Sequence, residues 1–158
     1  MFSKVFTSVF AVSLFLSGGA FALTGEQVVE HEVIVKNADG TQTVKRVRAD
    51  MVTPGDTVVY SLNYFNEKNE TADNVVLVMP IPAEVSYLEG TADVEGARTA
   101  YSADGGKTFA ARTALNVIDV NGKSRPARAQ DITHIRWMIG TPIAPKASGT
   151  LSYSARLK

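Results

Sequence analysis

Hydrogen-bonding side chains and glycines concentrate in residues 102–109, which run Ser-Ala-Asp-Gly-Gly-Lys-Thr-Phe. This stretch fits the Asp-box pattern, Ser-x-Asp-x-Gly-x-Thr-aromatic. A carboxylate such as that of Asp104 accepts hydrogen bonds from turn amides, and the two glycines allow the chain to close tightly around it. The spacing therefore predicts a hairpin organised by Asp104, with Phe109 packed beneath it.

The Asp box also suggests one functional hypothesis, a glycan-directed enzyme or binder, because sialidases carry such boxes. In sialidases the boxes repeat around a propeller and lie away from the catalytic centre. This chain contains one box, and one box cannot build a propeller. We therefore expect residues 102–109 to be structural, and we keep the glycan-directed function as an alternative.

Imidazole and thiol chemistry is restricted, because the chain has two His residues and no Cys. His31 lies between two glutamates, but the two-residue period of a strand directs them to the opposite face. His134 is expected to be a solvated strand residue. No serine lies in a Gly-x-Ser-x-Gly elbow, the setting of many nucleophilic triads. We accordingly predict no catalytic residue, no metal ligand and no cofactor, and hence a protein that is not an enzyme.

Two charged loops complete the set of candidate sites. Glu67, Glu70 and Asp73 share a polar loop, where solvated side chains are more expected than a calcium site. A basic segment offers a possible docking point for an acidic partner, although charge runs in loops are usually only solvated. The possible partner-binding residues of that segment are Lys123, Arg125 and Arg128.

Residues 1–22 have the organisation of a signal peptide. Lys4 supplies a positive start, residues 5–16 are mainly apolar, and residues 20–22 give the Ala-x-Ala pattern that a signal peptidase recognises. The apolar run is shorter than the roughly 20 residues that cross a bilayer. We predict cleavage after Ala22, no transmembrane segment in the mature chain, and a periplasmic or secreted location.

Cleavage there leaves 136 residues with 15 basic and 16 acidic side chains, a formal net charge of −1. This length suits one domain, residues 23–158. No basic excess is available to attract phosphates, so we expect no nucleic-acid partner. Since the chain lacks Cys, its stability must come from packing rather than from disulfides.

The mature chain consists of short β-branched and aromatic runs bounded by Gly, Pro, Asn and Asp. From residue 57 the alternation is clear, with Val58, Tyr60 and Leu62 on one face, the expected core face. Asp39-Gly40 predicts a tight turn between two such runs. The predicted strands are 28–36, 41–47, a strand from 57, 74–79, 85–88, 98–102, 107–111, 115–120, 131–139 and 150–157.

Two further expectations concern individual segments. Residues 74–79 are apolar on both faces, which is typical of a strand in the centre of a sandwich. Residues 122–130 are basic and poor in large apolar side chains, and we expect a mobile loop. Together the strands predict an all-β fold, an antiparallel immunoglobulin-like β-sandwich with an added N-terminal β-hairpin.

The stretch from residue 52 to residue 90 resembles the bacterial conserved-repeat family catalogued as domain of unknown function eleven. The matching segments are 54–60 (Pro-Gly-Asp-Thr-Val-Val-Tyr), 72–78 (Ala-Asp-Asn-Val-Val-Leu-Val) and 81–87 (Ile-Pro-Ala-Glu-Val-Ser-Tyr), and residues 135–137 and 143–151 resemble the family's last two strands. The resemblance implies an immunoglobulin-like core over about residues 50–158 of an exported or surface protein, with no catalytic residues to carry over. Met79 and Glu84 depart from the family's usual Asp and Gly.

These observations favour a non-enzymatic exported β-sandwich with a binding or structural role in the bacterial envelope. Its partner would be an unknown protein or envelope component, and its oligomeric state stays open. An alternative is a subunit or chaperone of a surface assembly that exchanges β-strands. That alternative is suggested by the β-rich segment 23–47, which precedes the family-like core.

Overall fold

The computed structural model describes residues 23–49 and 52–158, so the predicted signal peptide and its cleavage site lie outside the described residues. None of the helices within these ranges is long and apolar enough to cross a membrane. The elements are β1 (Leu23–Lys36), β2 (Gln42–Arg48), β3 (Thr57–Asn66), β4 (Val76–Pro80), β5 (Val85–Tyr87), β6 (Ala97–Ser102), the 3-10 helix η1 (Arg112–Ala114), β7 (Asn116–Ile118), β8 (Ser124–Pro126), the 3-10 helix η2 (Ala129–Asp131), β9 (His134–Ile139) and β10 (Ser148–Leu157).

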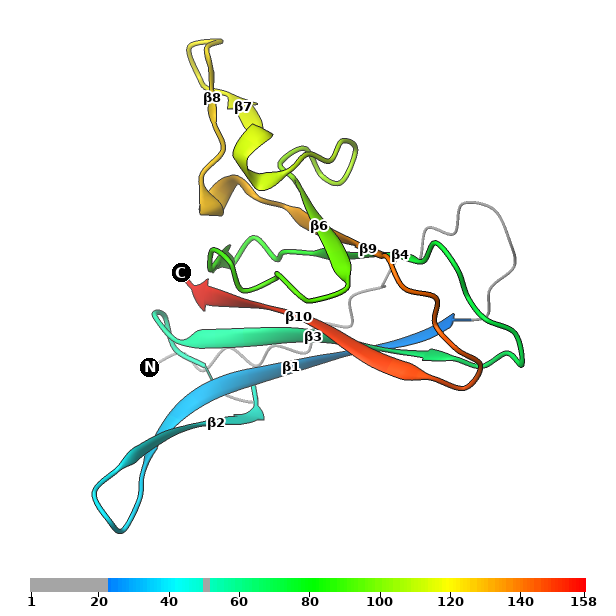
Figure 1. The fold of residues 1–158 in the computed structure, drawn as a ribbon. Helices are drawn as coiled ribbons and strands as arrows, with labels where there is room; N and C mark the ends of the chain where they lie inside the picture. The colour runs from blue at the N-terminus through cyan, green and yellow to red at the C-terminus, as the bar shows by residue number, and fades with distance from the viewer. Residues whose placement is uncertain (1–22, 50–51) are drawn as a thin grey trace.

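Two antiparallel sheets form the body of the molecule (Figure 1). The first has the strand order β2-β1-β3-β10-β5, and the second has the order β4-β9-β6. A separate hairpin, β7–β8, projects at the top of the view, and the far end of β1–β2 projects at the lower left. The predicted all-β antiparallel sandwich with an N-terminal hairpin is therefore confirmed.

The core lies between the sheets, and the two-residue period of the strands explains which side chains enter it. On β3, Val58, Tyr60 and Leu62 are buried as predicted. Trp137 of β9 has no exposed surface, and its indole nitrogen donates a hydrogen bond to the Ala92 carbonyl at 2.8 Å. The Tyr60 and Tyr153 rings stack at 5.0 Å between centroids within the first sheet, and Tyr87 of that sheet contacts Tyr101 of the second sheet at 5.6 Å, so aromatic side chains join the layers.

Strand β4 corrects the expectation for residues 74–79. It pairs only with β9 and is an edge of its sheet rather than a central strand. Leu77 and Met79 are nevertheless buried on one face, and Val78 is buried on the other. The apolar run indicates that both faces of β4 are covered, and both faces of an edge strand can be covered as well.

Two further segments differ from their predictions. Residues 107–111 do not form a strand, because the amides of Lys107 and Thr108 donate to the Asp104 side chain, and only Ala110 bridges to Tyr101. Residues 122–130 are not a structureless loop, since they contain β8 and the start of η2. Polar contacts hold the segment at both ends, because the Lys123 amide donates to Asp119 and the Arg125 side chain donates to Asp131, and a count of apolar residues does not detect them.

Strand β1 extends well beyond the body of its sheet. It pairs with β3 from Leu23 to His31 and with β2 from Glu30 to Lys36. The last part of the β1–β2 hairpin therefore lacks support from β3. We call the two-stranded part, residues 32–46, the arm; its cross-strand pair Ile34 and Val44 is 70% and 63% exposed.

Candidate functional site

The Asp-box turn is present, and its carboxylate is fully engaged within the turn. Asp104 accepts hydrogen bonds from the hydroxyls of Thr108 (2.6 Å) and Ser102 (2.7 Å) and from the backbone amides of Thr108 (3.0 Å) and Lys107 (3.1 Å). These bonds, led by that of the Thr108 hydroxyl, hold the pKa of Asp104 well below its usual range. All four stabilise the charged carboxylate where it stands, so the group is structural.

Ser102 ties this turn to the sandwich. It has no exposed surface, and its hydroxyl accepts hydrogen bonds from the amides of Gly106 (2.9 Å) and Asp104 (3.3 Å). Phe109 packs on the guanidinium of Arg136, 4.4 Å from the ring centroid. The aromatic residue of the box thus contacts β9, and the whole pattern serves to attach the turn to the second sheet.

The two histidines lie apart and have different surroundings. His134 is half-buried against the Asp-box turn, so the expectation of a solvated residue is wrong, and burial lowers its pKa while nearby Asp104 opposes that shift. His31 lies 3.6 Å from the carboxylate of Asp56. Within residues 23–49 and 52–158, no group of three or more His, Asp or Glu side chains is arranged to hold a metal ion.

The basic segment is partly neutralised. The guanidinium of Arg125 donates to both carboxylate oxygens of Asp131, at 2.7 and 3.1 Å, and the backbone amide of Arg128 donates to the same carboxylate at 2.7 Å. The Arg125 hydrogen bonds lower the pKa of Asp131. The side chains of Lys123 and Arg128 are exposed. Partner binding by Lys123, Arg125 and Arg128 stays a prediction, and Arg125 has a structural role of its own.

The acidic loop is organised by the residue that precedes it. Asn66 ends β3, is 2% exposed, and donates through its amide nitrogen to the carbonyls of Glu70 (2.8 Å), Ile143 (3.1 Å) and Ala144 (3.2 Å). Its side-chain oxygen accepts a hydrogen bond from the backbone amide of Lys68 at 3.1 Å. Asn66 thereby fixes the end of β3 to the loop that leads into β10.

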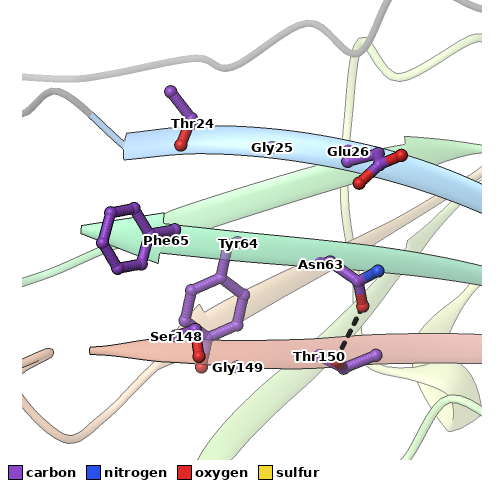
Figure 2. Close-up of a pocket in the computed structure, with 9 residues that line it drawn as sticks. All are labelled: Thr24, Gly25, Glu26, Asn63, Tyr64, Phe65, Ser148, Gly149 and Thr150. Atoms are coloured by element: carbon purple, nitrogen blue, oxygen red, sulfur yellow. Dashed lines mark hydrogen bonds between the residues drawn. The ribbon is translucent and has the colours of Figure 1, made fainter. Parts of the chain in front are cut away.

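Next to this anchored strand end, an open depression of about 360 Å³ lies over β1, β3 and β10 (Figure 2). Residues that alternate along these strands place six side chains on the same face of the sheet. We call this set the sheet-end platform. Its members are Thr24 and Glu26 of β1, Asn63 and Phe65 of β3, and Ser148 and Thr150 of β10.

The register arranges the platform in two rows. Phe65 lies between Thr24 and Ser148, and Asn63 lies between Glu26 and Thr150. The Thr150 hydroxyl donates to the Asn63 side-chain oxygen at 2.8 Å, and the Asn63 amide nitrogen makes no hydrogen bond to the other platform side chains (Figure 2).

Three residues lie between the two rows of the platform. They are Gly25, Tyr64 and Gly149, and the intervening positions of the three strands face the opposite side of the sheet. Only Tyr64 carries a side chain on that side. The Tyr64 ring lies directly over Gly149, so that a β-carbon at Gly149 would collide with the ring and its hydroxyl. An aromatic ring that covers a cross-strand glycine helps to fix the register of a sheet.

Sequence reasoning did not find the platform. The alternation that puts Val58, Tyr60 and Leu62 on the core face directs Asn63 and Phe65 outward, but it does not say which strands lie beside them. The missing step was the pairing of β3 with β1 and β10, which lie far from one another in the sequence. A signal was present in the hydroxyl residues that recur at alternate positions of β10, opposite its buried Leu151, Tyr153 and Ala155.

Comparison of the chain with protein-family models, with curated proteins and with solved structures gave no match.

Proposed function

We propose that this chain is an exported, non-enzymatic β-sandwich that acts by binding a component of the bacterial envelope. The observation that carries the proposal is the contrast between its polar clusters. The Asp104 carboxylate accepts hydrogen bonds from residues of its own turn, whereas the sheet-end platform has hydrogen-bonding groups open to solvent beside an exposed aromatic ring. Open, unreactive polar groups around an apolar surface suit recognition rather than catalysis.

The proposal of export rests on residues 1–22, with their positive start, apolar run and Ala-x-Ala ending. Leu23 is the first residue of β1 and is buried, so a chain that begins at Leu23 keeps the whole strand. The resemblance of residues 52–90 to domain of unknown function eleven supports a place at the cell surface or in the periplasm. We propose a relationship to that family on these grounds.

Two measurements test this function. The full chain with a C-terminal tag, produced in a Gram-negative host, should appear in the periplasmic or extracellular fraction with Leu23 as its N-terminus. The purified exported protein should then sediment with isolated envelopes. Asn63→Ala should reduce the bound fraction, and Ile118→Ala, which changes an exposed apolar residue of β7, should not. Retention in the cytoplasm would contradict export, and equal binding by both variants would contradict the platform.

A second candidate function is strand exchange within a surface assembly, and the arm favours it. β2 is the edge of its sheet, and all seven of its residues are exposed. An open edge of this kind can accept a further strand. Light scattering after size exclusion would show a mass that rises with concentration if copies of the chain exchange strands. A constant monomer mass would exclude exchange between copies.

A further inference from the structure

We propose that the sheet-end platform binds a neutral saccharide, with one sugar ring stacked on Phe65 and its hydroxyls bound by the polar side chains of the adjacent row. This inference rests on the proposed binding function and names its ligand class.

Phe65 supplies the apolar part of such a site. It is 37% exposed and lines the depression. Every other aromatic side chain within residues 23–49 and 52–158 is buried or half-buried. A lone aromatic ring left open to solvent on a sheet face, with hydroxyls on both sides of it, is suited to the C–H face of a pyranose ring.

The second row supplies the directional part. The Glu26 carboxylate can only accept hydrogen bonds, the Asn63 amide nitrogen can donate, and the Thr150 hydroxyl keeps lone pairs that can accept. Neighbouring strands lie about 4.8 Å apart and alternate residues about 7 Å apart. Vicinal hydroxyls around a sugar ring on Phe65 would reach donors and acceptors at this spacing.

The side chains of the platform retain capacity for a ligand. In the part of the chain that the structure describes, Asn63–Thr150 is the one hydrogen bond between platform side chains, and Thr24, Glu26 and Ser148 make none through their side chains. A ligand with several hydroxyls would satisfy these groups without breaking a bond that holds the fold. Polar pocket groups of this kind fix the orientation of a ligand.

Charge selects a neutral saccharide over other ligands. The nine residues that line the depression include no Lys, Arg or His and one carboxylate, Glu26. A phosphate, a nucleic acid or an acidic sugar would meet a like charge with no cation to offset it. A lipid chain would bury the open hydroxyls and the carboxylate without partners. A polyhydroxylated neutral ring meets neither cost.

The test is a titration of the ¹⁵N-labelled mature protein followed by amide chemical shifts. The probes are maltotriose, cellotriose and triacetylchitotriose, with trigalacturonic acid as the anionic comparison. We expect at least one neutral probe at about 10 mM, a concentration that fills most of a site of millimolar affinity, to shift the amides of Asn63, Phe65 and Thr150. Trigalacturonic acid should leave them in place.

Two variants separate the site from the fold. Phe65→Ala should weaken binding about tenfold or more, since the stacking surface is lost, and Ile118→Ala should bind as the parent does. Both side chains are exposed, so both proteins should keep the parent's amide spectrum elsewhere. A neutral probe that binds Phe65→Ala as tightly as the parent would overturn the proposal.

Absence of shifts with all three neutral probes would also overturn it, as would equal binding of trigalacturonic acid. If envelope binding persists in that case, the proposed function stands and its partner is an envelope component other than a neutral saccharide. If the exported protein also fails to bind envelopes, the proposed function itself fails.

Discussion

The Asp-box turn and the sheet-end platform are both rich in Ser, Thr and acidic or amide side chains. They differ in whether these side chains form hydrogen bonds within the protein. In the turn, Ser102 and Asp104 are held by bonds to the segment that contains them. On the platform, Asn63 makes one side-chain bond and Glu26 makes none within the described residues. Composition alone therefore does not separate a structural polar cluster from a binding surface.

The same contrast exists within a single strand. Asn66 and Asn63 lie three residues apart on β3, but Asn66 is 2% exposed with four side-chain hydrogen bonds, whereas Asn63 is exposed. Because three is an odd number, the alternation of the strand sends them to opposite faces. The destination of the hydrogen bonds, and not the residue type, decides which asparagine holds the fold.

The largest expected effect is that of Asn66→Ala. It removes the donor to the carbonyls of Ile143 and Ala144 and the acceptor for the Lys68 amide. Leaving such groups unpaired near a buried strand end should lower the free energy of unfolding by about 2–4 kcal/mol. Denaturant titration measures this loss. Asn63→Ala is the matched control and should change stability by less than about 0.5 kcal/mol. Equal losses in the two variants would erase the distinction between them.

Gly149→Ala should have the next largest effect. A β-carbon at this position would collide with the Tyr64 ring, and the displacement should cost about 1–3 kcal/mol in the free energy of unfolding. Adding Tyr64→Ala removes the collision, so the double variant should be more stable than the sum of the two single losses predicts. Thermal and denaturant unfolding of all four proteins measures the coupling, and strict additivity would show that the ring does not rest on Gly149.

Ser102→Ala probes the hub of the Asp-box turn. The variant loses the acceptor for the Gly106 and Asp104 amides and the donor to the Asp104 carboxylate. We expect a loss of about 1–2 kcal/mol, measured by denaturant titration. The comparison is Ser148→Ala on the platform, where the side chain is exposed and a change below about 0.5 kcal/mol is expected. A larger loss at Ser148 than at Ser102 would reverse the contrast between the platform and the Asp-box turn.

Much of the fold is predictable from the sequence because alternation is a local signal. The period that places Val58, Tyr60 and Leu62 in the core operates within one strand, as does the Asp39-Gly40 turn between β1 and β2. Two predictions that depended on contacts with other segments were wrong. The edge position of β4 depends on its partner strand, and the lack of a strand at 107–111 depends on where the Asp104 side chain binds.

The candidate site was less predictable for the same reason. The two rows of the platform come from strands that begin at Leu23, Thr57 and Ser148, so their side chains meet only after the sheet has formed. Asn66 shows the limit clearly. Its position in a polar stretch predicts a loop residue, but its three carbonyl partners lie at positions 70, 143 and 144. Long-range pairing, which a single sequence does not reveal, turns it into an anchor.

The smallest expected effect is a change in the pH dependence of stability, caused by Asp104→Asn. The pKa of Asp104 in the folded state is lowered from the ordinary value of 3.8 for an aspartate, so at low pH the unfolded state binds the proton first. The stabilisation from the carboxylate is therefore fully present above pH 3.8 and is lost as the pH falls below that value toward the lowered pKa. An asparagine does not titrate, so the variant should lose less stability than the parent across this window. Urea titrations at several acidic pH values measure the two slopes. Identical slopes would show that the Asp104 carboxylate does not hold its turn, and the Asp box would then join the platform as a polar group open to a ligand.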